Sequence, residues 1–162
     1  MSKLYVNELV PRDASVITAP NLQLPAGSVV QVVQGTLLIT DTSISSSSYI
    51  ATNLKATITP KSISNKILIL IHCHLQVQSG TSMPIALYRN GSNIVSRLVS
   101  LSNPVADGQP ASANWLDSPS SISALEYEVY ALNENTSYSA KFGNQSASGI
   151  AFNTITLMEI AQ

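Results

Sequence analysis

The sequence predicts an all-β fold, a jelly-roll-like β-sandwich of about eight strands with an extended N-terminal arm. Apolar and polar residues alternate with a period of two in several segments, most clearly in Lys66–Gln78. Gly, Pro, Asn and Ser separate these segments at the short intervals typical of sandwiches. No segment of helical length carries apolar residues at the i, i+3, i+4 spacing of an amphipathic helix. These three observations exclude a helical bundle.

Residues 1–27 predict an extended N-terminal arm. Pro11, Pro20 and Pro25 interrupt them, and their short apolar pieces show no sustained period. Residues 28–162 then form the predicted head domain. A chain of 162 residues is long enough for one hydrophobic core, so a single domain is expected after the arm.

Strands of the head follow from the alternation and from the turn residues. Pro60 ends the second strand, because proline has no amide hydrogen to donate to a neighbouring strand. Asn90-Gly91 predicts a two-residue hairpin turn, because both turn positions need a positive φ. The region Asn103–Asn114 is rich in Pro, Gly, Ser and Ala and predicts a loop. The expected strands are Val29–Gln34 running into Thr36–Thr40, Leu54–Thr59, Lys66–Gln78, Ile85–Arg89, Asn93–Val95, Arg97–Leu101, Leu125–Leu132, Tyr138–Phe142 and Asn153–Ile160.

The strand Lys66–Gln78 has one wholly apolar face and one mixed face. The mixed face begins with Leu68 and Leu70 and becomes polar at His72 and His74. Apolar residues on both faces, together with few charges, predict that part of the outer surface is buried against other copies of the chain. The wholly apolar face consists of Ile67, Ile69, Ile71, Cys73, Leu75 and Val77.

Composition excludes several classes of function. Charged residues make up 10% of the chain, against roughly 25% in a typical globular protein, and the net charge is −1. Lys and Arg are scattered, so no nucleic-acid partner is expected. No apolar stretch approaches the length of a membrane span, so no membrane is expected. Arg12 and Asp13 interrupt any signal-peptide pattern, so synthesis is assigned to the cytoplasm. Cys73 is the only cysteine, which excludes an intrachain disulfide.

Two histidines are the residues closest to a metal-binding pattern. His72 and His74 share a strand face, and such a pair can chelate a metal if further ligands approach. Cys73 points to the opposite face and cannot join them, so packed, hydrogen-bonded histidines are the favoured interpretation. No metal or cofactor is therefore predicted. In a trimer the three copies of the pair could still meet on the symmetry axis.

Catalytic patterns are absent from the sequence. There is no Gly-x-Ser-x-Gly nucleophile turn and no phosphate-binding glycine loop. Glu126 and Glu128 share a strand face, but neighbouring tyrosines favour a solvated face over a carboxylate pair for catalysis. Trp115 follows the predicted loop and has two interpretations. It is either an exposed aromatic residue that binds a partner or, the favoured alternative, a buried residue that fixes the loop.

Five segments, in this order and spacing, carry a resemblance to a known family: Gly27–Gln34, Ile58–Ile69, Ala86–Gly91, Leu116–Pro119 and Thr154–Ile160. Together they resemble small virion structural proteins of tailed bacteriophages, often from cyanobacterial and marine hosts and frequently described as tail-fibre-like. The likeness covers most of residues 27–160. It implies a homotrimeric sandwich head on the virion surface, assembled in the host cytoplasm, with no catalytic residues.

A short arm before such a head favours a capsid decoration (cement) protein over a fibre. In this interpretation the arm contacts the major capsid protein or sister subunits through Leu4, Tyr5, Val6, Leu9 and Val10. The alternative is the receptor-binding head of a tail fibre or spike, attached to a tail protein and recognising a host surface glycan or protein. Its candidate contacts are the Asn90-Gly91 turn and the predicted loop that ends near Trp115.

Overall fold

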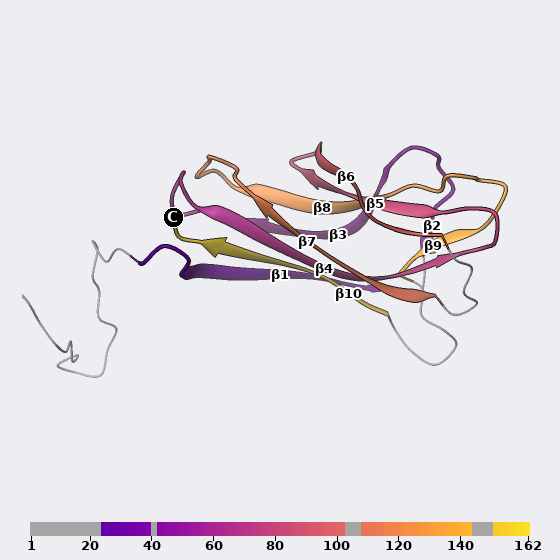
Figure 1. Ribbon diagram of the computed structural model, residues 1–162, viewed down its shortest axis with the longest axis horizontal. Helices are drawn as coiled ribbons and strands as arrows, with labels where there is room; N and C mark the ends of the chain where they lie inside the picture. Colours follow the sequence, from indigo (N-terminus) through magenta and orange to yellow (C-terminus); the bar gives the residue numbers. More distant parts are fainter. Residues whose placement is uncertain (1–23, 40–41, 103–107, 144–150) are drawn as a thin grey trace, which may run out of the picture.

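The computed structural model describes residues 24–39, 42–102, 108–143 and 151–162, which form two β-sheets packed face to face (Figure 1). The long strands run along the sandwich, and the C-terminus lies at the end where β1 begins. Residues 1–23 of the predicted arm, with all five of its candidate contacts, lie outside the described residues. The strands are β1 (Val29–Ile39), β2 (Thr42–Ser43), β3 (Ile50–Ile58), β4 (Lys66–Val77), β5 (Met83–Arg89), β6 (Ser92–Leu101), β7 (Gln109–Asp117), β8 (Leu125–Ala131), β9 (Ala140–Phe142) and β10 (Ala151–Ile160).

Strand order identifies a jelly roll. The six-stranded sheet has the order β1-β10-β4, with β7 on the free side of β4 and the short strands β9 and β2 beyond the end of β10. The four-stranded sheet has the order β3-β8-β5-β6, and every neighbouring pair in both sheets is antiparallel. Eight long strands in two such sheets are the jelly-roll architecture. The predicted all-β sandwich is confirmed.

The core lies between the two sheets and is built from alternate residues of each strand. On β4 the predicted apolar face is fully buried, from Ile67 through Cys73 to Val77. The facing sheet contributes Leu87 and Tyr127, both completely buried. Burying an apolar side chain of this size contributes about 1.5–3 kcal/mol, so these alternating residues drive the two sheets together.

The turn between β5 and β6 has the predicted geometry. Asn90 and Gly91 have φ values of 49° and 76°, as a two-residue hairpin turn requires. Asn90 also fixes the turn to β8, because its amide donates to the Glu126 carbonyl (2.9 Å) and its side-chain oxygen accepts from the Glu126 amide (2.8 Å). The two short strands expected after the turn are one strand, β6, in which Arg97 (φ 53°) forms an irregularity in the pairing with β5.

The prediction of a loop up to Asn114 is wrong, because Gln109–Asp117 forms the edge strand β7 along β4. Pro110 is tolerated there since an edge strand has one side whose amides need no partner. Trp115 is paired with Ile69 and is 40% exposed, so the favoured interpretation of a buried tryptophan that fixes a loop is also wrong. Ala111, one of the small residues that suggested a loop, is partly buried and packs against the core.

A polar network joins the two sheets at one end of the sandwich. Arg89 of β5 forms an ion pair with Asp117 of β7 (2.6 Å), and the Tyr127 hydroxyl of β8 donates to the same carboxylate oxygen (2.7 Å). Burial and the bond to Asp117 raise the pKa of Tyr127, so its hydroxyl stays protonated and remains a donor. The network therefore ties edge strand β7 to the opposite sheet.

Tyr127→Phe is expected to lower the free energy of unfolding by about 1–2 kcal/mol, because it leaves the partly buried Asp117 carboxylate without one charge-assisted hydrogen bond. Urea-induced unfolding measures the change. Tyr138→Phe is the matched control, since that tyrosine is 39% exposed, and it is expected to change stability by less than about 0.5 kcal/mol. Equal losses in the two variants would show that the network contributes nothing.

Candidate functional site

The two carboxylates considered for catalysis lie on the outer face of the four-stranded sheet. Glu126 forms an ion pair with Lys55 across the strand pair (3.0 Å), and Glu128 accepts a hydrogen bond from the Asn53 amide (3.2 Å). Each carboxylate is thus engaged with a neighbour on its own sheet, and the described residues contain no group of three or more His, Cys, Asp and Glu side chains that could hold a metal. The predicted solvated face holds for Glu126, whose side chain is 40% exposed, but it is wrong for Glu128, which is buried.

His72 and His74 share the outer face of β4, as predicted. Their rings are perpendicular with centroids 5.5 Å apart, and the His72 Nδ1 atom lies 3.1 Å from the Ser112 hydroxyl. Burial and the charge of His72 lower the pKa of His74. Its Nδ1 atom is buried and has no hydrogen-bond partner within the described part of the chain. Cys73 points into the core, where burial raises the pKa of its thiol to about 12.

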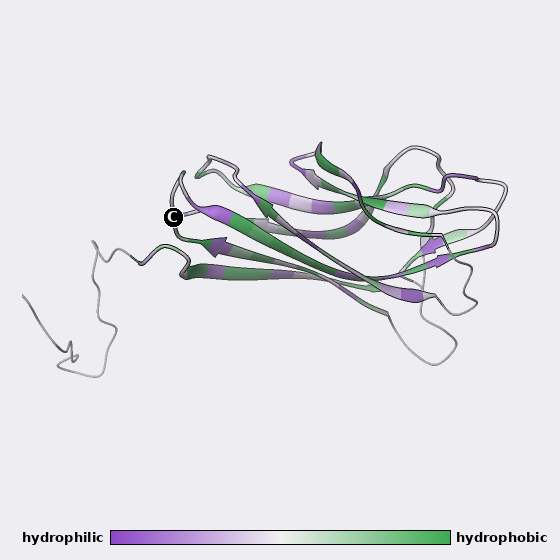
Figure 2. Cartoon of the chain, in the orientation of Figure 1, coloured by the Kyte–Doolittle hydropathy of each residue, from purple (hydrophilic) through white to green (hydrophobic). Residues whose placement is uncertain are grey.

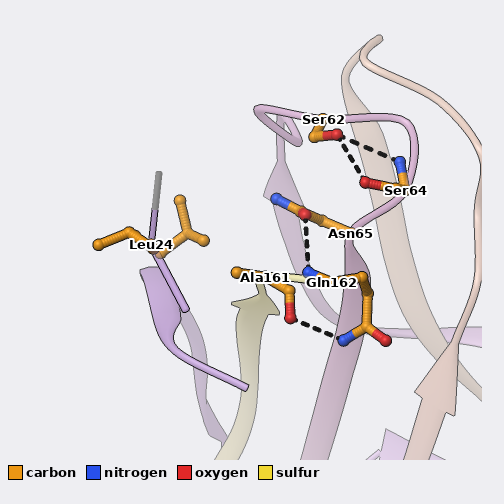
Figure 3. A pocket seen from close by; sticks show the side chains of 7 residues that line it. Leu24, Ser62, Ser64, Asn65, Ala161 and Gln162 are labelled. Carbon is orange, nitrogen blue, oxygen red and sulfur yellow. Dashed lines mark hydrogen bonds between the residues drawn. The ribbon is translucent and has the colours of Figure 1, made fainter. Parts of the chain in front are cut away.

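A shallow pocket of about 440 Å³ lies at the end of the sandwich where β1 begins and β10 ends (Figure 3). Its polar groups bond to one another: Ser62 and Ser64 hydroxyls are 2.9 Å apart, and the Gln162 amide donates to the Asn65 side-chain oxygen (3.3 Å). No titratable side chain lines it. The two serine hydroxyls therefore have no acid or base side chain beside them among the residues that line the pocket.

Next to this pocket, Glu159 is completely buried at the end of β10. Its carboxylate accepts hydrogen bonds from the Lys61 amide (2.6 Å), the Asn65 side chain (2.7 Å) and the Gln31 side chain (2.6 Å). Burial alone would raise the pKa of Glu159, but the bonds from Asn65, Gln31 and the backbone outweigh it and lower the pKa. Glu159 therefore acts as an anionic clamp between β1, β10 and the β3–β4 loop.

The outer side of the six-stranded sheet carries the most extensive apolar surface. On it, Phe152, Leu38, Val32, Leu116 and Leu70 are 62%, 55%, 54%, 50% and 38% exposed. Strand register places them on one side, because Val32 lies in one row with Leu116, Leu70 lies in the next row, and Leu38 is paired with Phe152 at the same alternation along β1 and β10. Figure 2 shows the apolar colouring along β4 and at the start of β1. We call this surface the outer apolar face, consisting of Val32, Leu38, Leu68, Leu70, Leu116, Phe152 and Met158.

The outer side of the four-stranded sheet has a different character. It carries the Lys55–Glu126 ion pair, Glu128 and an aromatic pair, Tyr88 and Tyr130, whose rings stack at 3.8 Å. Tyr49 contacts Tyr88 edge-on at 6.4 Å. We call Tyr49, Tyr88 and Tyr130 the tyrosine cluster. One side of the sandwich is thus charged and aromatic, and the other is apolar and almost free of charge.

Sequence-based candidates for receptor contact are not gathered in one loop. Asn90 and Gly91 occupy the β5–β6 turn, whereas Trp115 lies within edge strand β7. The Arg89–Asp117 ion pair brings the turn and the end of β7 to the same end of the sandwich. The tyrosine cluster was missed from the sequence, because its three members come from separate segments. The outer apolar face was foreseen only on β4, although Phe152 and Met158 follow the same alternation on β10.

Comparisons with known proteins do not identify a family. No family model matches the chain, and no match is found among curated proteins. The crystal structure of the infectious bursal disease virus VP2 subviral particle is similar with 13% identity and a TM-score of 0.48, over 93% of this chain and 46% of that one. The structure of the Gx strain of that virus gives 12% identity and a TM-score of 0.37, over 94% and 45%.

Dimeric latent PorU from Porphyromonas gingivalis is also similar, with 13% identity and a TM-score of 0.37, over 86% of this chain and 14% of that one. The chain thus spans less than half the length of each of these three proteins. Matches at these identities and scores carry no argument about function. Among the described residues, no helix is long and apolar enough to cross a membrane.

Proposed function

We propose that the chain is a virion structural protein of a tailed bacteriophage, a homotrimeric decoration (cement) protein that binds the outside of the capsid. The observation that carries the proposal is the asymmetry of the sandwich, with an apolar outer face on one sheet and a charged outer face on the other. A large exposed apolar face is typical of a protein that works packed against other proteins. The resemblance of residues 27–160 to phage virion proteins supports the same conclusion.

In this proposal the protein acts mechanically and has no catalytic residues. The head stands on the capsid, and the arm reaches the major capsid protein or sister subunits through Leu4, Tyr5, Val6, Leu9 and Val10. Each apolar contact contributes about 25 cal/mol per Å² of buried surface, before the cost of ordering the chain. Repeated over many copies, such contacts strengthen the capsid against the pressure of the packaged genome.

Copy number per virion tests this function. We expect hundreds of copies per particle, comparable to the number of major capsid subunits, because a decoration protein occupies every equivalent lattice position. Quantitative mass spectrometry of purified virions against the major capsid protein measures the ratio. A dozen or so copies would place the protein on the tail instead, and its absence from purified particles would contradict any structural role in the virion.

The tyrosine cluster supports a second candidate function, the receptor-binding head of a tail fibre or spike. Partly exposed aromatic rings beside carboxylates, as in this cluster, can bind sugars, because the ring face packs on the apolar face of the sugar while polar groups accept hydroxyl hydrogens. Purified protein would then bind host cells and block infection. Tyr88→Ala is expected to abolish that binding, with Ile122→Ala as a control at an exposed loop residue outside the tyrosine cluster. Unchanged binding by Tyr88→Ala would exclude the tyrosine cluster.

A further inference from the structure

We propose that the outer apolar face lines the threefold axis of the homotrimer and packs there against the same face of two sister copies. The inference rests on the homotrimer of the proposed function and assigns it a surface. It makes the six-stranded sheet the assembly side of the molecule and leaves the charged, aromatic side of the four-stranded sheet free.

Strand register organises the outer apolar face into rows. Val32 is paired with Met158, Met158 with Leu68, and Leu68 with Leu116, so one apolar row crosses β1, β10, β4 and β7 without a break. The next row contains Leu70, with Thr156 as its partner on β10. Side chains in one row lie about 5 Å apart, close enough to form a continuous surface. This apolar row crosses the four long strands, and Leu38, which is paired with Phe152, forms a separate apolar pair beyond the polar row of Thr36, Thr154 and His72.

The face has the charge distribution that association with its own copies requires. Around a symmetry axis, each residue near the axis meets the same residue of the other copies, so a charged side chain there repels itself. Charged residues on this face stand at its two ends, Lys66 at the start of β4 and Lys141 on β9. The central rows hold hydroxyl and amide side chains such as Thr156 and Asn114, which both donate and accept hydrogen bonds.

The outer face of the four-stranded sheet does not have this charge distribution. Its central strand β8 carries Glu126, which is paired with Lys55, and three copies of this ion pair packed around an axis would have to lose their contact with water. Sister copies are therefore better matched to the outer apolar face than to the outer face of the four-stranded sheet.

Dimensions of the face suit a threefold arrangement. Four strands spaced about 4.8 Å apart and roughly nine residues long give a face of about 19 Å by 30 Å. If three such faces enclose the axis as the sides of a triangular prism, each sheet lies about 5 Å from the axis. This distance is half the usual spacing of about 10 Å between packed sheets. The trimer would bury roughly 1,500 Å² in total, or about 500 Å² for each pair of subunits, so this face supplies about half of the approximately 1,000 Å² of a specific two-partner interface.

Leu70→Lys tests the inference, because Leu70 lies on central strand β4 and its side chain is 38% exposed in the single chain. Three ammonium groups near the axis are expected to raise the dissociation constant of the trimer by at least about 100-fold. Sedimentation velocity of the full chain at micromolar concentrations measures the oligomeric state, and circular dichroism confirms that the variant is folded. Thr57→Lys, on the exposed outer face of β3, is the matched control and should remain trimeric.

Thr156→Cys gives a second test, in which the trimer is expected to stay assembled. Thr156 faces outward beside Leu70, so oxidation is expected to join pairs of chains by a disulfide near the axis, whereas Thr57→Cys should stay uncrosslinked. Native Cys73 does not interfere, since it is completely buried. A monomeric or dimeric wild-type protein, or a trimer unaffected by Leu70→Lys and not crosslinked through Thr156→Cys, overturns the inference. The copy number per virion is independent of both results, so the proposed function and this surface can fail separately.

Discussion

Glu159→Gln is expected to lower the free energy of unfolding of the head by about 3 kcal/mol, although it changes one oxygen to an amide nitrogen. The Glu159 carboxylate accepts from three donors in a completely buried position. Glutamine replaces one acceptor oxygen by an NH₂ group, which faces donors and leaves at least one of them unpaired. A buried unpaired donor costs about 1–3 kcal/mol, and each bond to a charged group contributes about 1.5–3 kcal/mol. Chemical denaturation measures the loss.

The same carboxylate gives stability a pH dependence. The pKa of Glu159 in the folded chain lies below its ordinary value of 4.5, so its contribution is fully present above about pH 4.5. It is lost as the pH falls through the lower, folded-state pKa. We expect the wild-type protein to lose more stability between neutral and acidic pH than Glu159→Gln does.

Glu126→Gln is the matched control for this experiment. Glu126 is paired with Lys55 on the surface, where both side chains are about half exposed, and such pairs contribute about 0–1 kcal/mol. If the two variants lose equal stability, or if Glu159→Gln retains the wild-type response to acid, the carboxylate does not act as a clamp.

Gly35→Ala is expected to destabilise the sandwich by at least about 3 kcal/mol or to prevent folding, because the two sheets meet at this residue. A Cβ atom at Gly35 would lie 1.9 Å from the carbonyl oxygen of Lys55 and 3.1 Å from a methyl group of Ile155. The first contact is with backbone, so β1 and β3 would have to move apart. Thermal unfolding and the yield of soluble protein measure the effect.

Gly91→Ala separates the steric cost from the general cost of replacing glycine. Gly91 has a positive φ of 76° but no atom within 4 Å of an added Cβ. Its replacement should cost only the strain of the left-handed conformation, about 1–2 kcal/mol. A Gly35→Ala variant as stable as Gly91→Ala would show that the sheets separate easily at this edge.

Local patterns predicted the parts of the fold that depend on local rules. The alternation in β4 shows in the sequence because the strand is central and its inner residues all face one core. The β5–β6 turn is predictable because Asn90 and Gly91 supply the required backbone conformation themselves. In these segments the side chains alone determine the structure.

β7 was not predicted, because its structure depends on a neighbouring strand rather than on its own sequence. Pro110 and the small residues around it favour a loop in isolation, and only the presence of β4 beside them makes an edge strand the better solution. Glu159 escaped because its partners come from β1 and from the β3–β4 loop. A signal was present nevertheless, since Glu159 occupies the same inward position as Ile155 and Leu157, where an unpartnered carboxylate would not be tolerated.

The sequence predicts that an apolar outer face exists, but it does not predict how many strands the face crosses. Leu68 and Leu70 on β4 already indicated a buried outer surface, but the row that joins them to Val32 and Leu116 depends on strand register. The register between strands that are distant in sequence is set by the folded core, and no single segment of the sequence predicts it.

The position of β10 has a consequence for how the protein is made. The last strand of the head in sequence order, β10, lies between β1 and β4, the first and third long strands in that order. Until β10 is synthesised, both neighbours present unpaired edges, and the six-stranded sheet cannot close. Pairing of such distant segments is slow. Meanwhile, the unpaired edges of β1 and β4 can pair with β10 of another chain that is being synthesised. Polysomes that bring several growing copies together would therefore favour strand exchange between subunits.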